Sequence, residues 1–227
     1  ESRICLNIID SNNKSTEILE SGPNINKEEI DEFENYLSKV LEETEILVAS
    51  GSLAKGLPKD YYLRIGNLCR QKNIKFILDS SGESLKLGIN SKPYLIKPNI
   101  DELENLSKVK IKNVDDIINI SRSILLTGVE NVCVSMGKDG MVLVNKDFVY
   151  KVEIPNIKIV NTVGSGDSSI AGFSLGILKG YDLKDTLKLS NACGMSNAMH
   201  ISTGDVNLED INKFIDEIKV YEYVCNV

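Results

Sequence analysis

The feature that most constrains the fold is a series of short, nearly continuous apolar runs with helical patterns between them. Strands that helices cover on both faces have this composition, because neither face meets water. Helices are predicted after Pro58, near 100–107 and at about 114–126. The alternation predicts a three-layer α/β sandwich with a mostly parallel sheet. The runs are "EILVAS" (45–50), "IKFILDS" (74–80), "YLIKPN" (94–99) and "NVCVSMG" (131–137).

The segments on either side of these runs predict a hairpin at one end and helices at the other. Arg3 to Ile9 and Ser15 to Leu19 alternate like short strands around the polar cluster "DSNNK". Asn26 is placed to cap a helix with apolar residues at helical spacing. We expect a hairpin in residues 1–20 and one α/β domain in residues 21–227. Further along, "MVLV" and "FVYKVEI" predict antiparallel strands, and the last third predicts helices over Gly164–Lys179, Leu183–Met199 and Leu208–Val220.

The net charge of the chain indicates which classes of partner it can bind. It has 26 Lys and Arg against 33 Asp and Glu, a formal net charge of −7. A surface that binds nucleic acid needs concentrated positive charge, so the composition argues against such a partner. The sequence offers no apolar run of the ~20 residues that a membrane span requires. We therefore expect a small-molecule partner, with no nucleic acid and no membrane.

The cysteines and the single histidine argue against a zinc site. Five cysteines lie far apart with no C-x-x-C pair, and His200 is the only histidine. Zinc sites use clustered Cys and His ligands, which this sequence does not offer. The odd number of scattered cysteines fits a reducing compartment, so we expect a cytoplasmic protein. His200 is expected to be a partly buried residue at a helix end.

The segment "VNTVGSGDSSIAGF" (160–173) predicts a helix whose amino end suits an anion. Small residues let backbone N–H groups approach charged oxygens, and the helix dipole adds a positive potential. Asp167 nevertheless places a carboxylate there. It is either a helix cap, or a general base that acts while the backbone of Gly164, Ser165 and Gly166 holds a phosphoryl group. The sequence has neither the G-x-x-x-x-G-K-[ST] phosphate loop nor the dinucleotide fingerprint.

The same segment resembles the carboxyl-terminal signature of the PfkB (ribokinase-like) carbohydrate kinases. Three further blocks, in the family's order, resemble its branch that phosphorylates hexose phosphates, which includes tagatose-6-phosphate kinase and 1-phosphofructokinase. The resemblance implies a ribokinase-like α/β/α sandwich with a small β lid, ATP and Mg²⁺ as cofactors, and a ketohexose phosphate as the substrate. The tail "ACGMSNAMHISTGDVNLEDI" favours tagatose 6-phosphate over fructose 1-phosphate. The three blocks are "VASGSLAKGLPKDYY", "LDSSGESL" and "LIKPNIDEL".

Matched residue by residue, the resemblance implies roles for several side chains. Asp167 is the catalytic base beside the anion hole of residues 164–166. Lys97 and Asn99 contact the nucleotide, and Asn99 and Glu102 organise magnesium and its waters. The ATP-binding set consists of Ser135, Met136, Gly137, Lys138, Asp139 and Gly140, together with Thr162 and Gly194.

The sugar side is assigned to fewer residues. Ser52 matches a hydroxyl near the sugar phosphate, and Arg3, on the first strand, matches a cation that the lid offers to the phosphate. Lid strands often pair family members, so the resemblance also implies a homodimer through the hairpin. Simpler roles stay open, with Lys97 as a solvated side chain and Asn99 and Glu102 as a helix capping box.

The front of the family pattern is not found in this sequence. The chain lacks an initiator Met and begins inside a strand-like alternation, so we expect the front of a longer chain to be missing. A chain that starts at Glu1 is predicted to bind nucleotide weakly and to have little or no kinase activity; equal turnover in an N-terminally extended chain would refute this. The alternative of another class is an inactive fragment or a sugar-phosphate- or nucleotide-binding module. A nucleotide-dependent oxidoreductase is disfavoured, because the glycine loop comes too late in the chain.

Overall fold

The computed structural model describes residues 2–9 and 15–223, and its centre is a seven-stranded sheet. The strands lie in chain order, and the first four pair in parallel. The remaining pairings are antiparallel, as predicted for "MVLV" and "FVYKVEI". The strands are β3 (Ile46–Ser50), β4 (Lys75–Asp79), β5 (Leu95–Ile96), β6 (Asn131–Ser135), β7 (Met141–Asn145), β8 (Val149–Glu153) and β9 (Lys219–Glu222).

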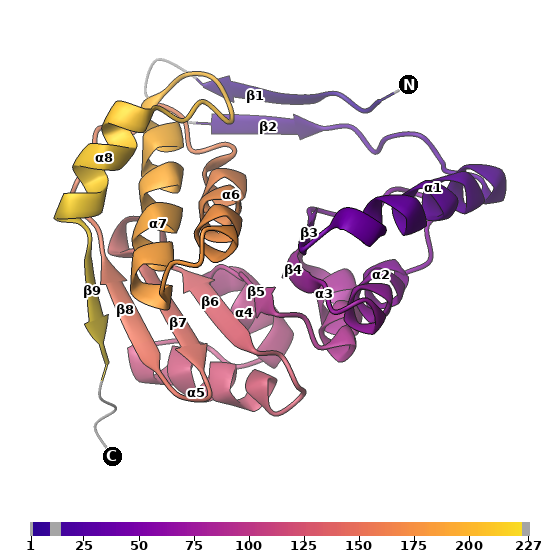
Figure 1. Ribbon diagram of the computed structural model, residues 1–227. Coiled ribbons are helices and arrows are strands. Elements are labelled where there is room, and N and C mark those ends of the chain that lie inside the picture. Colours follow the sequence, from indigo (N-terminus) through magenta and orange to yellow (C-terminus); the bar gives the residue numbers. More distant parts are fainter. Residues whose placement is uncertain (1, 10–14, 224–227) are drawn as a thin grey trace.

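Helices cover both faces of this sheet, which confirms the predicted three-layer sandwich (Figure 1). Among the described residues, five α-helices precede the loop that leads to Gly164, and three follow it. The first group is α1 (Lys27–Val40), α2 (Tyr61–Gln71), α3 (Gly82–Gly88), α4 (Ile100–Ser107) and α5 (Val114–Leu125). The second group is α6 (Ser165–Leu178), α7 (Leu183–Met199) and α8 (Leu208–Glu217).

The sheet separates two apolar cores, and alternate residues of its strands belong to different cores. Leu78 in β4 packs among α1 to α5, whereas its neighbour Ile77 packs among α6 to α8. Leu95 and Ile96 in β5 divide in the same way. Successive side chains of a strand point to opposite faces, so a strand between two helical layers must be apolar throughout. This geometry explains the continuous apolar runs of the sequence.

The amino-terminal strands form a small separate sheet. In it, β1 (Cys5–Ile9) pairs antiparallel with β2 (Ser15–Leu19), as predicted, while the cluster "DSNNK" lies outside the described residues. Figure 1 shows this hairpin apart from the large sheet. Arg3 was expected on the first strand, but β1 begins at Cys5, because the regular pairing with β2 runs only from Cys5 to Ile9. Asn26 caps α1, and a reciprocal bond from the Asn26 N–H to Glu29 completes a capping box.

The carboxyl-terminal end corrects the sequence prediction. A helix was expected as far as Val220, but α8 ends at Glu217 and residues Lys219–Glu222 form β9. Val220 lies opposite Val152 of β8, so sheet pairing replaces the last helical turn. Val and Tyr favour such pairing when a strand edge is available. No helix among the described residues has both the length and the apolar character to cross a bilayer.

Candidate active site

Polar side chains end four neighbouring strands at one edge of the sheet. Ser50 ends β3, Asp79 ends β4, Lys97 directly follows β5 and Ser135 ends β6. These strands are parallel, so their carboxyl ends meet at the same edge. That edge is where doubly wound sheets bind ligands.

Asp167 lies in the first turn of α6 and faces this edge. The hydroxyl of Ser50 donates a hydrogen bond of 2.8 Å to Oδ1 of Asp167, across 117 residues of sequence. The Asp167 carboxylate is exposed, and Ser50 fixes its orientation. Sequence reasoning missed Ser50. Its only signal was a hydroxyl residue at the end of an apolar run, next to a glycine.

The loop before α6 leaves backbone donors at the amino end of the helix. Gly164 caps the helix with φ +82°, a left-handed conformation that glycine adopts without strain. The Ser165 N–H donates to the Thr162 carbonyl at 3.2 Å. Within the described part of the chain, the N–H groups of Gly166 and Asp167 have no acceptor, as is usual in a first helical turn. These two N–H groups and the helix dipole give the loop a positive potential.

Lys97 brings a cation under this loop. It is only 6% exposed, and its Nζ lies 3.3 Å from Oδ2 of Asp79. A Cβ atom built onto Gly166 would lie 3.5 Å from the same Nζ. The alternative of a solvated Lys97 is therefore wrong, because the side chain is buried and its ammonium group pairs with Asp79. Sequence reasoning also missed Asp79, although it lies in the block "LDSSGESL".

Burial and charge act against each other at Asp79. Burial raises the pKa of this carboxyl, and the charge of Asp167 raises it further, whereas the adjacent Lys97 ammonium lowers it. The effect of burial is larger than that of Lys97, so the pKa of Asp79 lies above its ordinary value. Cys133, in the neighbouring strand β6, is fully buried, and burial raises the pKa of its thiol to about 12. The charged pair of Asp79 and Lys97 thus borders the apolar interior of the protein.

Asn99 and Glu102 form a capping box at the start of α4. Oδ1 of Asn99 accepts from the Glu102 N–H at 2.8 Å, and Oε2 of Glu102 accepts from the Asn99 N–H at 2.9 Å. The Ser135 N–H donates to the Pro98 carbonyl, which brings β6 beside this helix start. The described residues contain no group of three His, Cys, Asp or Glu side chains able to hold a metal ion by themselves.

The segment expected to bind ATP forms a tight turn between β6 and β7. The Met136 N–H donates to the Gly140 carbonyl around the short helix η3 (Gly137–Asp139). Gly140 has φ +84°, and a Cβ there would collide with the Val152 carbonyl, so only glycine fits. Met136 packs partly into the core, while Lys138 and Asp139 are exposed.

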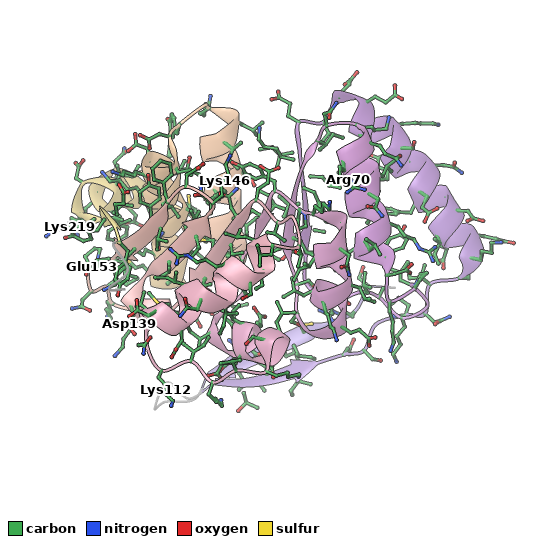
Figure 2. The ribbon with its side chains drawn as sticks, turned by 90° about the horizontal axis from the view of Figure 1, so that it is seen from below. Arg70, Lys112, Asp139, Lys146, Glu153 and Lys219 are labelled. Carbon is green, nitrogen blue, oxygen red and sulfur yellow. The ribbon has the colours of Figure 1, made fainter. Side chains whose placement is uncertain are left out.

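An open hollow of about 640 Å³ lies beside this turn. Met136, Lys138 and Asp139 line it, together with residues of the linker before α5 and of β8. Figure 2 shows three of the lining residues, Lys112, Asp139 and Glu153, on one side of the molecule.

The other two residues expected to bind the nucleotide lie outside this turn. Thr162 is exposed in the loop before α6. Gly194 lies on α7 against the first turn of α6, where a Cβ would come within 3.0 Å of the Ser165 carbonyl oxygen. The absence of a side chain at Gly194 therefore lets α7 approach the first turn of α6 closely.

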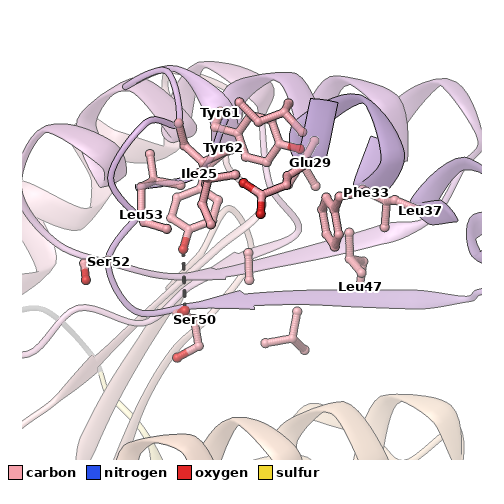
Figure 3. A pocket seen from close by; sticks show the side chains of 16 residues that line it. Ile25, Glu29, Phe33, Leu37, Leu47, Ser50, Ser52, Leu53, Tyr61 and Tyr62 are labelled. Carbon is pink, nitrogen blue, oxygen red and sulfur yellow. Dashed lines mark hydrogen bonds between the residues drawn. The ribbon is translucent and has the colours of Figure 1, made fainter. Parts of the chain in front are cut away.

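One of the two expected sugar-side residues, Ser52, lies at an apolar hollow of about 520 Å³ between α1, α2 and β3 (Figure 3). Ser50 and Ser52 lie on its wall. The Tyr62 hydroxyl donates to the carbonyls of Gly51 and Ser50, at 3.1 Å and 3.5 Å, and so holds the loop between the two serines. Arg3 is exposed in the segment before β1.

His200 is a partly buried residue at the end of α7, as predicted. Its Nε2 lies 2.8 Å from Oδ2 of Asp210 in α8. It therefore joins two helices, and the structure does not place it among the strand-end residues.

Comparisons with known proteins agree with this geometry. The sequence profile described as "pfkB family carbohydrate kinase" matches residues 1–210. The chain is 43% identical to a protein named tagatose-6-phosphate kinase from Staphylococcus epidermidis, over 98% of this chain and 72% of that protein. Phosphofructokinase-2 from Escherichia coli, solved with potassium, has a TM-score of 0.87 at 25% identity, over 95% of this chain and 71% of that chain. The same enzyme solved with substrates and products has a TM-score of 0.84 at 26% identity, over 94% and 70%.

The profile match covers most of the chain, and the structural match extends through both helical layers and the sheet between them. The strand-end side chains and the glycine loop of α6 lie where a phosphoryl-transfer site requires polar and anion-binding groups. The chain belongs to the pfkB family of carbohydrate kinases and is a sugar kinase.

Proposed function

We propose that this kinase transfers a phosphoryl group from ATP to a ketohexose phosphate, with tagatose 6-phosphate as the preferred substrate. The observation that carries the proposal is Asp167, an exposed carboxylate oriented by Ser50 beside backbone donors and a buried lysine. The 43% identity to a protein named tagatose-6-phosphate kinase supports the choice of sugar.

The geometry divides the chemistry between acid–base and anion-binding groups. The Ser50 bond occupies Oδ1 of Asp167, so Oδ2 is the oxygen that takes the proton from the acceptor hydroxyl. The backbone of residues 164–166 and the Asp167 N–H bind the transferred phosphoryl group, which gathers charge on its oxygens. Lys97, below Gly166, neutralises part of that charge. Ser52 and Arg3 bind the phosphate that the sugar already carries.

The residues present fit Mg²⁺ as a partner of the nucleotide phosphates. The capping box uses only Oε2 of Glu102, so Oε1 has no partner among the described residues. Asn99 lies beside it at the same strand-end edge. A cation that keeps most of its water shell needs few protein ligands of this kind. When bound, Mg²⁺ neutralises phosphate charge, and Asn99 and Glu102 would orient its waters. The turn of residues 135–140, with Thr162 and Gly194, would bind the nucleotide.

Replacing the proposed base tests this function directly. In the complete product of the gene, Asp167→Asn is expected to lower kcat at least about a hundredfold, since general-base catalysis contributes about 10²–10⁴-fold. ATP affinity, measured by calorimetry, should stay near normal. Asp147→Asn, an exposed aspartate in the β7–β8 turn, is the matched control and should keep full activity. A variant of Asp167 that keeps more than a few per cent of activity would remove the residue from this role.

A substrate panel separates the remaining alternatives. Tagatose 6-phosphate, fructose 1-phosphate and fructose 6-phosphate are assayed with ATP at equal concentrations. We expect the highest kcat/KM for tagatose 6-phosphate. Highest turnover of fructose 1-phosphate would assign a 1-phosphofructokinase. Binding of a sugar phosphate without turnover of any member would support a binding module instead of an active kinase.

The hairpin supports a homodimer as part of the proposal. Leu6 and Ile18 are paired neighbours, and with Ile8 they stand about half exposed on one face of a two-stranded sheet. A second hairpin would cover this apolar face. Leu6→Lys should then shift the sedimentation of the protein from dimer to monomer, and an unchanged sedimentation coefficient would contradict the pairing.

The unpaired thiols of Cys5, Cys69, Cys133 and Cys193 support a reducing compartment such as the cytoplasm.

A further inference from the structure

Asn197, near the end of α7, is completely buried and connects the loop before α6 to the loop after α7. Its side chain has 0% exposure. Nδ2 donates to the Val163 carbonyl at 2.9 Å and to the Ser165 hydroxyl at 3.0 Å. Oδ1 accepts from the Gly204 N–H at 2.7 Å. One amide group therefore bonds to three groups, at the start of α6, in the loop before it and in the loop after α7, and a buried polar group held by several hydrogen bonds is strongly fixed in place.

The bond to Val163 affects the donors of the anion hole. In a helix that continued backwards, the Asp167 N–H would donate to the Val163 carbonyl four residues earlier. Asn197 takes that carbonyl, and the Asp167 N–H has no acceptor among the described residues. A second amide supports the same loop, since Asn161 accepts from the Val163 N–H and donates to the Ile201 carbonyl. The loop thus keeps its donors directed away from the helix.

Asn197 also limits the space around Gly164. A Cβ built onto Gly164 would lie 3.3 Å from Oδ1 of Asn197 and 2.6 Å from Cγ2 of Thr203. The left-handed cap of α6 therefore packs directly against the residues that Asn197 holds. A shift of the amide would move Gly164, and with it the first turn that carries Asp167.

We infer that Asn197 is a positioning residue for phosphoryl transfer: it holds the anion-hole loop so that the N–H groups of α6 point at the transferred group. The inference rests on the proposed function of that loop. It assigns Asn197 no contact with either substrate. Its effect should therefore appear in kcat, where the phosphoryl charge develops, and much less in the affinity for ATP.

Asn191 provides a matched control for this inference. It lies on the same helix, is 6% exposed, and its Nδ2 donates to the Leu187 carbonyl at 2.8 Å and to the Met141 sulfur. Replacing either asparagine by alanine removes a buried amide of the same size. Only Asn197 bonds to the loop before α6.

The experiment compares Asn197→Ala with Asn191→Ala in the complete product of the gene. Both variants should unfold at lower temperatures by similar amounts. Asn197→Ala should lower kcat about tenfold to a hundredfold, the scale that a misplacement of about 1 Å produces, with an ATP Kd within about threefold of the parent. Asn191→Ala should keep kcat at 20 °C. Equal kcat values for the two variants would overturn the inference.

A double-mutant cycle with Ser165→Ala sharpens the test. This change removes only the hydroxyl that Asn197 contacts and leaves the backbone N–H in place. The kcat effects of Asn197→Ala and Ser165→Ala should be less than additive, because they remove the same contact, whereas Asn191→Ala and Ser165→Ala should add. Additive effects for Asn197 would contradict the coupling.

The Asp167→Asn variant shows whether the proposed function or only this inference has failed. If Asp167→Asn stays active, the proposed function fails. If Asp167→Asn is inactive while Asn197→Ala has a normal kcat, only this inference fails.

Discussion

The packing of α6 against α7 and the surroundings of α1 differ sharply, although both regions border the candidate site. In the first region small residues bring two helices into close contact. Gly172 approaches Cys193 and the Leu189 carbonyl so closely that a Cβ would lie 2.8 Å and 2.9 Å from them. The hydroxyls of Ser169 and Ser190 meet between the helices at 2.8 Å.

The second region presents apolar side chains that the described residues leave uncovered. Among the residues of α1 only Leu37 is buried, while Phe33 is 48% and Tyr36 66% exposed. Val48 of β3, the first strand in the sheet order, is 38% exposed. The apolar hollow of Figure 3 lies between these elements.

The difference teaches that the two halves of the site depend on different parts of the chain. The half around the start of α6 is fixed by contacts within residues 160–204 and at the ends of β4 and β5. The half next to β3 and α1 has an amphipathic helix and an apolar strand. Their sequence patterns predict a helix and a strand, but do not indicate which residues cover their apolar side chains. Mutations should therefore be costly in the first half and mild in the second.

The largest expected effect is the loss of the buried cation in the first half. Lys97→Met leaves the Asp79 carboxylate buried without its partner, which should lower the free energy of unfolding at pH 8 by about 3–5 kcal/mol. The pKa of Asp79 is already raised by burial and should rise further without Lys97. A carboxyl whose folded pKa is raised stabilises the fold below its unfolded pKa of about 4, and that stability is lost as the pH rises through the folded pKa.

Urea unfolding at pH 5 and at pH 8 measures this effect. Lys97→Met should be closer to the parent at pH 5 than at pH 8. Adding Asp79→Asn to the same variant should remove most of the additional pH dependence. An identical pH dependence in Lys97→Met and the parent would show that Asp79 is not desolvated in solution.

An intermediate effect is expected at the contact between α6 and α7. Gly172→Val inserts a side chain where a single Cβ already collides, so it should cost about 1–3 kcal/mol. Ala171→Val, at the adjacent exposed position of the same helix, is the control and should cost less than about 1 kcal/mol. Thermal unfolding of the two variants decides the question. Equal losses would mean that the two helices separate easily.

The smallest effect is expected on α1. Phe33→Ala should cost less than about 1 kcal/mol, because the ring is half exposed. Phe173→Ala, at a ring only 1% exposed in α6, should cost about 3–5 kcal/mol and shows the sensitivity of the measurement. A loss for Phe33→Ala close to that for Phe173→Ala would break the comparison, since it would mean that α1 is covered in solution.

Local patterns predicted most of the fold from the sequence. The apolar runs located β4 and β6, because a strand buried on both faces leaves a continuous signal. The run at β3 located that strand too, although Val48 stays 38% exposed there. Asn26 located the start of α1 through its capping chemistry. The prediction failed at β9, because a short segment with Val and Tyr suits either a helix end or an edge strand. Only the pairing with β8 decides between them.

The candidate site was less predictable because its contacts are long-range. Asp167 could be proposed from the sequence, because its carboxylate stands in a glycine loop at a predicted helix start that suits an anion. Ser50, Asp79 and Asn197 could not be identified by reasoning from local patterns, as each acquires its role only from a partner on another element. The capping box of Asn99 and Glu102 shows the converse case, where local chemistry alone explains the observed bonds.

The strand at the end of the described chain affects how the protein should be shortened or tagged. A truncation at the end of α8 would stop near Glu217 and remove β9. The long edge of β8 would then lose its neighbour, from Tyr150 to Glu153, and present unpaired backbone groups to other molecules. Exposed edges of this kind promote aggregation. Soluble expression should therefore require the chain at least through Glu222, with any affinity tag attached beyond it.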